Sequence, residues 1–302
     1  MREIRIAIVD FLNAAPLAWG LTEGPLEGQY DLSFAAPSRC ADMLRRSDVD
    51  AAIIPAIEYQ RIDDLAVVPG LAIAARQEVR SILVVAKKPI QRVQRLALDT
   101  SSRSSAGLVR LLCKKRWRIH PEFVEADPDP IVMLAGADAA LVIGDPALRI
   151  AVKMDALAVR LPTGEQCCQG DPEDMPVPGY DSLYVYDVAH EWREMTSLPC
   201  VLALIAGRRE ALTPTVVADF QASCDYGKTR FAEIAEAASL KLDLPAGALE
   251  QYLRENLDYS LDGKNLSGLE LYYRECAAAG LIPSARPLIF AAATLPAIAS
   301  QG

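Results

Sequence analysis

Short apolar runs recur along the chain, and each is followed at once by polar or turn-forming residues. Residues 4–9 are rich in isoleucine and are followed by Asp10 and Asn13, and residues 50–55 end in a proline. Runs of this length between turn-forming residues predict buried strands. We expect strands at residues 4–9, 31–35, 50–55, 81–86, 96–98, 123–124, 139–143 and 200–206.

The segments between these strands have the composition of helices and turns. We expect helices at residues 40–44, 104–114 and 187–196, and a largely helical chain from residue 207 to residue 279. Ser38 precedes the first helix, where serine is a favoured cap, and Gly144-Asp145-Pro146 has strong turn chemistry. Residues 163–181 are expected to form a surface loop. Strands that alternate with helices predict an α/β fold, with parallel or mixed sheets covered on both faces.

The order of these elements predicts two lobes. A chain of 302 residues exceeds the usual size of one compact domain. We expect a larger, discontinuous lobe from residues 1–92 and 189–302, and a smaller lobe from residues 93–188. The chain would cross between the lobes twice, which gives a central cleft and a two-strand hinge similar to those of type II periplasmic binding proteins.

Composition narrows the classes of function. With 40 acidic and 31 basic residues, the net charge of −9 gives the surface a negative field that repels nucleic-acid phosphates and anionic lipid. The longest apolar stretches fall short of the roughly 20 residues that span a bilayer. The first residues alternate charged and apolar side chains, unlike a signal peptide. We expect a cytoplasmic protein that binds neither nucleic acid nor membrane.

The sequence carries no strong metal, nucleotide or nucleophile motif. Its seven cysteines form no C-x-x-C pair, and neither His120 nor His190 lies at ligand spacing from a cysteine or carboxylate on a convincing helix. No G-x-x-x-x-G-K-[ST] loop, G-x-G-x-x-G turn or recognisable Ser-His-Asp arrangement occurs. We expect no metal and no cofactor, which leaves anion binding in a cleft, alone or as part of a cofactor-free reaction.

Three polar clusters follow directly after apolar strands, at residues 10–13, 99–105 and 144–145. If the strands are parallel, their carboxyl ends meet at one edge and the clusters face a shared crevice. The hydroxyls and backbone N–H groups around Thr100, Ser101 and Ser102 would bind an anion at the start of the next helix. Serine and threonine are also ordinary helix caps, and the sequence leaves both interpretations open.

Three other residues of these clusters also have two interpretations. Asn13, before Ala14-Ala15-Pro16, is either an N-cap or a functional amide. Asp145 either makes an Asx-turn or contacts a ligand directly. Arg103 is either a solvated charge at the helix start or a clamp for a carboxylate.

The local strings, taken in order, resemble those of a known enzyme family. They are DFLNAAPL at 10–17, IPAIEY at 54–59, VPG at 68–70, SIL at 81–83, LDTSSRSS at 98–105 and LVIGD at 141–145. The set is similar to the chorismate dehydratase family of the futalosine route to menaquinone, which looks like a type II solute-binding fold turned enzyme. The family usually opens with a Ser-Tyr pair where this chain has Asp10-Phe11, whereas Leu12-Asn13 is kept.

The resemblance implies elimination of water from chorismate to give 3-[(1-carboxyvinyl)oxy]benzoate. It implies that Asn13 is catalytic and orients the leaving hydroxyl or assists proton transfer. It also implies a set of substrate-binding residues: Ser38, Ser81, Thr100, Ser101, Ser102, Gly144 and Asp145. The alternatives are a relative of 1,4-dihydroxy-6-naphthoate synthase and a non-catalytic solute-binding protein for an aromatic carboxylate. We expect a monomer or a homodimer whose partner is a small molecule.

Overall fold

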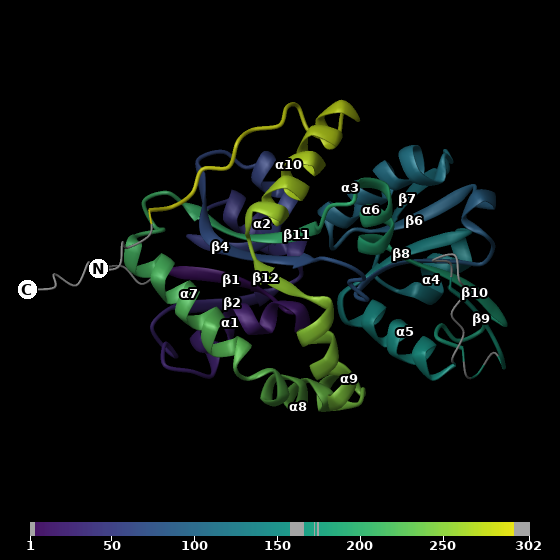
Figure 1. Ribbon diagram of the computed structural model, residues 1–302, viewed down its shortest axis with the longest axis horizontal. Helices are drawn as coiled ribbons and strands as arrows, with labels where there is room; N and C mark the ends of the chain where they lie inside the picture. Colours follow the sequence, from purple (N-terminus) through teal and green to yellow (C-terminus); the bar gives the residue numbers. More distant parts are fainter. Residues whose placement is uncertain (1–3, 158–165, 172, 174, 293–302) are drawn as a thin grey trace, which may run out of the picture.

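The computed structural model describes residues 4–157, 166–171, 173 and 175–292, and it places them in two lobes with a mixed six-stranded sheet each (Figure 1). In the first sheet, β1 is parallel to both β2 and β3, whereas β11 and β12 run antiparallel to their neighbours. The strands, in spatial order, are β12 (Asp258–Ser260), β4 (Leu65–Ala75), β11 (Cys200–Arg208), β3 (Ala51–Pro55), β1 (Arg5–Val9) and β2 (Asp31–Ala35).

The second sheet follows the same plan. Its strand β6, second from one edge, is parallel to β7 and β8, whereas β5, β10 and β9 continue the sheet in antiparallel pairs. The strands, in spatial order, are β7 (Glu122–Ala126), β6 (Arg95–Asp99), β8 (Ala139–Ile143), β5 (Ile82–Ala86), β10 (Ser182–Asp187) and β9 (Gln166–Gln169).

The chain crosses between the two sheets twice, first after β4 and again after β10. The predicted two-lobed α/β architecture is thereby confirmed. The predicted division put residues up to 92 in the first lobe, but β5 pairs with β8 and β10 of the second sheet. We therefore propose that the lobes divide at the two crossings, over residues 76–81 and 188–199.

Helices cover both faces of the first sheet (Figure 1). One face carries α1 and α7, which pack against each other, and the opposite face carries α2 and α10. Helices α8 and α9 extend toward the second lobe. The bounds are α1 (Ala15–Thr22), α2 (Pro37–Arg45), α7 (Pro214–Lys228), α8 (Phe231–Leu242), α9 (Ala246–Gln251) and α10 (Gly263–Ala278).

The second sheet separates two clusters of buried residues. Leu96 and Leu98 of β6 join a core that continues into the first lobe, while Ala97 between them points into a second, local core. Helices α3 (Arg103–Leu112) and α6 (Val188–Thr196) cover the side of the shared core; α4 (Pro130–Gly136) and α5 (Gly144–Ala156) cover the local one. The α3 side of the second lobe is therefore continuous with the first lobe.

Short helical segments connect several of these elements. Three are 3-10 helices, namely η1 (Leu12–Ala14), η2 (Ala56–Gln60) and η3 (Ile90–Arg92). Two are π-helices, η4 (Cys113–Trp117) after α3 and η5 (Tyr252–Asn256) after α9. None of the described helices combines the length and the apolar character needed to cross a bilayer.

Several local predictions were wrong, for physical reasons. Gly144 does not form a separate turn: its φ of +66° takes the chain directly from β8 into α5. Ser38 lies inside α2, whose N-cap is Ala36, so its hydroxyl does not cap the helix. Residues 166–169 of the expected surface loop form β9, where Cys168 is buried against β10.

Strand β4 was not predicted because Pro69-Gly70 interrupts its apolar run. The structure keeps the strand by letting residues 68–71 bulge out of the pairing with β11, and Gly70 there has a φ of +78°. A bulge is the usual place for proline and glycine within a strand.

Candidate functional site

A small cavity of about 40 Å³ lies between the two lobes. The ends of β1 and β3 contribute lining residues from the first lobe, and the starts of β5, α3 and α5 contribute them from the second. Of its 14 lining residues, four belong to the predicted site, and none has an ionisable side chain. The four are Asn13, Ser81, Ser102 and Gly144.

Asn13 lies on η1, directly after β1. It does not cap α1, whose N-cap is Ala14 and which has no side-chain capping bond. Its Oδ1 is buried and has no hydrogen-bond partner in the described part of the chain. Because buried polar atoms are normally paired, this amide oxygen is available to a donor within the cavity.

Ser81 is fixed at the first crossing between the lobes. Its backbone oxygen accepts a hydrogen bond from Gly144 N at 2.7 Å, and its Oγ accepts one from the hydroxyl of Tyr252 at 2.8 Å. Tyr252 begins η5 and belongs to the first lobe. Burial raises the pKa of Tyr252, so the phenol stays protonated and donates.

The serines at the start of α3 have different roles. Ser102 is the N-cap: its Oγ accepts from Ser105 N at 3.4 Å and lies 2.8 Å from Ser105 Oγ, and both residues line the cavity. Ser101 instead donates through its N and its Oγ to Asp99 Oδ1, at 2.7 and 2.5 Å. Ser101 does not line the cavity, so its hydroxyl orders the loop. Burial raises the pKa of Asp99.

Thr100 and Ser38 lie beside the interlobe cavity and do not line it. Thr100 is exposed and lines a separate polar cavity of about 390 Å³ with Arg61, Arg103 and other residues. Ser38 N donates to the backbone oxygen of Ser101 at 2.9 Å, which ties the start of α2 to the loop before α3. The structure thus brings neither residue into the lining of the interlobe cavity.

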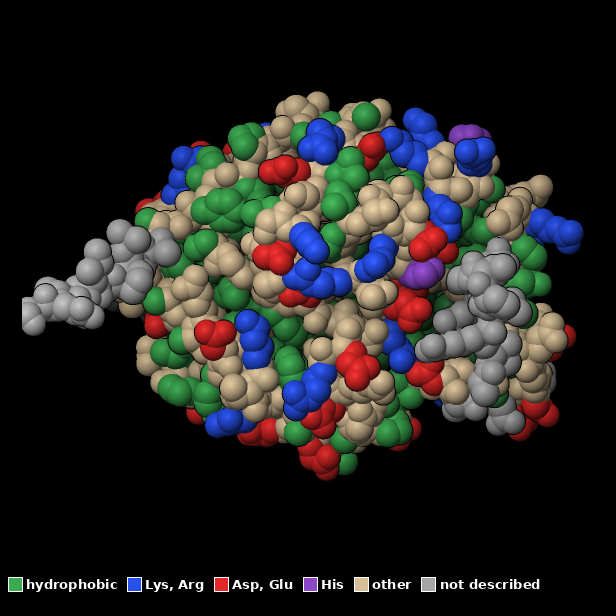
Figure 2. Space-filling model, in the orientation of Figure 1, with side chains coloured by type: hydrophobic (Ala, Val, Ile, Leu, Met, Phe, Trp, Pro, Cys, Tyr) green, Lys and Arg blue, Asp and Glu red, His purple; other side chains and the backbone are tan. Residues whose placement is uncertain are grey.

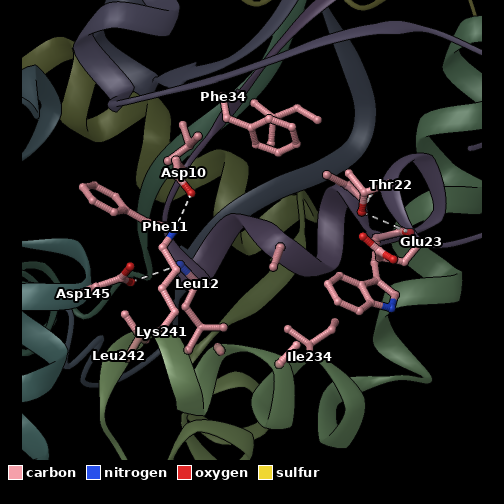
Figure 3. Close-up of a pocket in the computed structure, with 17 residues that line it drawn as sticks. Asp10, Phe11, Leu12, Thr22, Glu23, Phe34, Asp145, Ile234, Lys241 and Leu242 are labelled. Carbon is pink, nitrogen blue, oxygen red and sulfur yellow. Dashed lines mark hydrogen bonds and ion pairs between the residues drawn. The ribbon is translucent and has the colours of Figure 1, made fainter. Parts of the chain in front are cut away.

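Gly144 and Asp145 connect the start of α5 to the first lobe. A Cβ atom added to Gly144 would lie 2.7 Å from the ring of Phe11, so the ring packs directly on the glycine backbone. Asp145 Oδ1 accepts from Leu12 N at 3.1 Å (Figure 3). Burial raises the pKa of Asp145. Asp145 therefore bonds across the lobes and does not line the interlobe cavity.

A larger apolar groove of about 260 Å³ lies next to the interlobe cavity (Figure 3). It is lined by residues of α1 and α8, including Ile234, and by Phe34 at the end of β2. Lys241 Nζ and Asp10 Oδ1 form an ion pair of 2.8 Å at its edge. Phe11 lines both spaces, and its ring is directed toward Asp145 and the second lobe (Figure 3).

Arg103 pairs with carboxylates of the first lobe, and 31% of its side-chain surface stays exposed. Its guanidinium makes two bonds of 2.9 Å to the carboxylate of Asp42 and a third of 3.2 Å to Glu58 Oε2. Glu58 is fully buried and is also paired with Arg45 and Arg61. The Arg103 guanidinium holds the pKa of Asp42 below its usual value. This cluster joins the start of α3 to the first lobe.

Sequence reasoning missed three residues beside the cavity: Phe11, Ser105 and Tyr252. Ser105 follows Ser102 by three residues, so the spacing of a helix start would have placed them on one face. Phe11 was noted only as a departure from the family pattern. No local signal connects Tyr252 with Ser81, because they are 171 positions apart.

The arrangement is suited to an anionic organic ligand. Three serines, an asparagine and the starts of two helices line a space that has no ionisable side chain around it. On the face shown in Figure 2, basic and acidic side chains are interspersed. Among the described residues, no three or more His, Cys, Asp or Glu side chains are grouped so as to hold a metal ion.

Comparison with known proteins gives a consistent family and fold. A family model described as menaquinone biosynthesis matches residues 4–278. A chorismate dehydratase from Thermus thermophilus is 28% identical over 274 residues, which cover 90% of this chain and 94% of that one. Among solved structures, protein AF1704 from Archaeoglobus fulgidus has a TM-score of 0.66 at 18% identity, covering 93% of this chain and 98% of that one.

A second structural relative is a binding protein. The alkanesulfonate-binding protein SsuA from Xanthomonas axonopodis pv. citri, bound to MOPS, has a TM-score of 0.63 at 14% identity, covering 96% of this chain and 98% of that one. At this level of identity the likeness shows the fold alone, which is that of periplasmic binding proteins.

Proposed function

The chain belongs to the menaquinone biosynthesis family, and we propose that it catalyses the dehydration of chorismate to 3-[(1-carboxyvinyl)oxy]benzoate. The family match covers most of the chain, and the Thermus relative named for this activity aligns along nearly its whole length. This makes the protein an enzyme. Its class, a carbon–oxygen lyase that releases water, is part of the proposal, and the cytoplasmic location stays a prediction.

The proposed reaction is chemically suited to a site of this kind. The C3 hydrogen of chorismate is acidic because the ring carboxylate stabilises the charge through the intervening double bond. The C3–H and C4–OH bonds break, a C3=C4 bond forms, and the product ring is aromatic. The site has to hold two carboxylates, stabilise the developing charge on the ring carboxylate and place a base near C3.

The unpaired Oδ1 of Asn13 is the observation that carries the proposal. Asn13 lines the cavity and carries a buried acceptor without a partner, and the C4 hydroxyl of chorismate is a donor of the required kind. We propose that Asn13 holds this hydroxyl in line for departure. An amide is too weak a base to remove the C3 proton.

The base is proposed to come from the substrate. No Asp, Glu, His or Lys side chain is among the residues lining the interlobe cavity. The enolpyruvyl carboxylate of chorismate is attached through the ether oxygen on C3, so it can take the C3 proton within the same molecule. The proton then passes to the departing hydroxyl, and water leaves.

The ring carboxylate is proposed to bind at the start of α3. Ser102 and Ser105 line the cavity there, their hydroxyls lie 2.8 Å apart, and the positive end of the helix dipole favours an anion. Ser81 contributes a hydroxyl from another wall of the cavity, and Gly144 lets the substrate approach the backbone at the start of α5. Four further residues are proposed to hold these groups in position without lining the cavity: Thr100, Ser101, Ser38 and Asp145.

Substrate entry is proposed to require separation of the lobes. A cavity of about 40 Å³ is well below the roughly 300 Å³ or more of ordinary ligand pockets. Domain closure around a ligand is typical of two-lobed binding folds, and closure excludes water from the reacting groups. The neutral lining of the cavity then leaves the substrate carboxylate as the strongest base present.

The test is to incubate the purified protein with chorismate and follow the products by chromatography and mass. A product lighter by one water supports the proposal, and recovery of bound but unchanged chorismate would favour a non-catalytic binding protein. Asn13→Ala should reduce kcat by about 100-fold or more, as loss of a group acting on the reacting atoms does. Because Asn13 Oδ1 has no partner, the substitution removes no hydrogen bond of this atom. The urea concentration at the unfolding midpoint should therefore be at least as high for Asn13→Ala as for the wild type.

A further inference from the structure

A buried hydroxyl pair joins η5 of the first lobe to the first crossing between the lobes. Tyr252 OH lies 2.8 Å from Ser81 Oγ, and both residues are almost completely buried, with 2% and 1% of their surfaces exposed. Ser81 also lines the interlobe cavity. The Ser81 hydroxyl is therefore held by Tyr252, and Ser81 is one of the residues around the space proposed for the substrate.

The direction of the hydrogen bond follows from the chemistry of the two groups. A phenol is a stronger acid than an aliphatic alcohol, so Tyr252 is the donor and Ser81 Oγ is the acceptor. The hydrogen of Ser81 then remains free to point into the cavity. A hydroxyl that accepts such a bond is polarised and becomes a better donor itself.

The rest of Ser81 is also fixed. Its N–H donates to the oxygen of Val79 at 2.8 Å, and its carbonyl oxygen accepts from Gly144 N at 2.7 Å. Tyr252 lies in a π-helix, a local irregularity that is frequent at functional sites. Bonds of the backbone and of the side chain together fix the position of the Ser81 hydroxyl.

We propose that Tyr252 is a positioning residue that orients the Ser81 hydroxyl to donate to a carboxylate of the substrate. This inference rests on the proposed function for the identity of the carboxylate, but its physical content is the binding of an aromatic carboxylate in the interlobe cavity. Tyr252 itself does not line that cavity and acts only through Ser81.

A matched control is available in the same region. Tyr259 is also buried, with 4% of its surface exposed, but its hydroxyl has no hydrogen-bond partner in the described structure. Tyr252→Phe and Tyr259→Phe thus make the same chemical change at two buried tyrosines. Only the first removes a partner of Ser81.

The experiment measures chorismate turnover for Tyr252→Phe, Ser81→Ala, the double variant and Tyr259→Phe. Tyr252→Phe should lower kcat/KM about tenfold, because the lost interaction holds the substrate carboxylate in the ground state and in the transition state. Ser81→Ala should have an equal or larger effect, and the double variant should be no worse than Ser81→Ala alone. Tyr259→Phe should match the wild type.

Binding of 3-hydroxybenzoate, measured by calorimetry, separates this inference from the proposed reaction. Its dissociation constant should rise about tenfold in Tyr252→Phe but not in Tyr259→Phe. If the wild type leaves chorismate intact yet shows this difference in binding, the proposed function fails and the positioning role stands. Equal binding and equal kcat/KM in the two phenylalanine variants would overturn the positioning role. Additive effects of Tyr252→Phe and Ser81→Ala would overturn it as well.

Discussion

Helices α3 and α5 of the second lobe both begin beside the interlobe cavity, yet they are attached to the first lobe in different ways. The start of α3 is bonded to the first lobe through three residues. Ser104 Oγ accepts from Ile57 N at 3.0 Å, and Tyr272 OH donates to Ser104 O at 3.0 Å. Arg103 forms an ion pair with buried Glu58. This side also shares a continuous apolar core with the first lobe.

The start of α5 is attached by fewer groups. Its N-cap, Ile143, makes no side-chain capping bond. The connections to the first lobe described above are the bond from Leu12 N to Asp145 and the contact of Phe11 with Gly144, and further along the helix Arg149 donates to Leu242 O at 2.8 Å. We therefore expect the lobes to separate at α5 and to stay together at α3.

The largest effect should follow from removing the acid at the centre of the α3 attachment. Glu58→Ala leaves the guanidinium groups of Arg45, Arg61 and Arg103 close together, with Asp42 as their remaining carboxylate. Loss of one partner from a buried ion pair typically costs about 3–5 kcal/mol. The free energy of urea unfolding measures this loss.

The same substitution at an exposed glutamate is the control. Glu233 pairs with Arg230 at 3.2 Å, and its side chain is 56% exposed, so Glu233→Ala should cost less than about 1 kcal/mol. Equal losses in the two variants would mean that the buried cluster does not anchor α3, and the contrast between the two helix starts would be lost.

An intermediate effect is expected at the start of α5. Gly144→Ala introduces a side chain at a φ of +66°, which costs about 1–2 kcal/mol, and also pushes against the ring of Phe11. Gly28 provides the comparison, because it has a φ of +74° and no atom within 4 Å of an added Cβ. Gly28→Ala should therefore show the backbone cost alone.

Chorismate turnover distinguishes these two glycine variants further. Gly144→Ala should lower kcat/KM at least tenfold, since a displacement near 1 Å at a reacting site has effects of this size or larger. Gly28→Ala should keep the wild-type value. If Gly144→Ala unfolds like Gly28→Ala and retains turnover, Phe11 adapts freely and the α5 contact is looser than the structure indicates.

The sequence predicted the elements better than it predicted their contacts. Apolar runs identified β1, β3, β5, β8 and β11, because burial on both faces leaves a continuous apolar pattern. They could not show that β5 pairs within the second sheet, since pairing depends on residues far apart in the chain. Strand β4 was missed because a bulge hides its periodicity.

The candidate site was predictable in its clusters but not in its geometry. Asn13, Ser81, Ser102 and Gly144 were expected together and do line one cavity. The sequence could not show that Ser101 and Ser102 have different roles, because only the bond from Ser101 to Asp99 distinguishes their hydroxyls. Their roles in binding and catalysis stay predictions.

The smallest effect should come from Asp145, and its size depends on pH. Burial raises the pKa of this carboxyl above its value in the unfolded chain, so folding favours the protonated form. That contribution is fully present below the unfolded pKa of about 3.9, and it is lost as the pH rises through the folded pKa. At pH 7 the buried charge therefore costs stability, and Asp145→Asn should remove that cost.

Asp145→Asn should raise the free energy of unfolding at pH 7 by up to about 1 kcal/mol, because an amide oxygen still accepts from Leu12 N and carries no charge. The gain should shrink as the pH is lowered toward 4. Asp10→Asn is the matched control: it breaks the exposed pair with Lys241, should lose less than about 0.5 kcal/mol and should show no gain at neutral pH. A loss of 2 kcal/mol or more in Asp145→Asn would show that the charged bond to Leu12 holds α5 firmly, which would make the two helix starts equivalent.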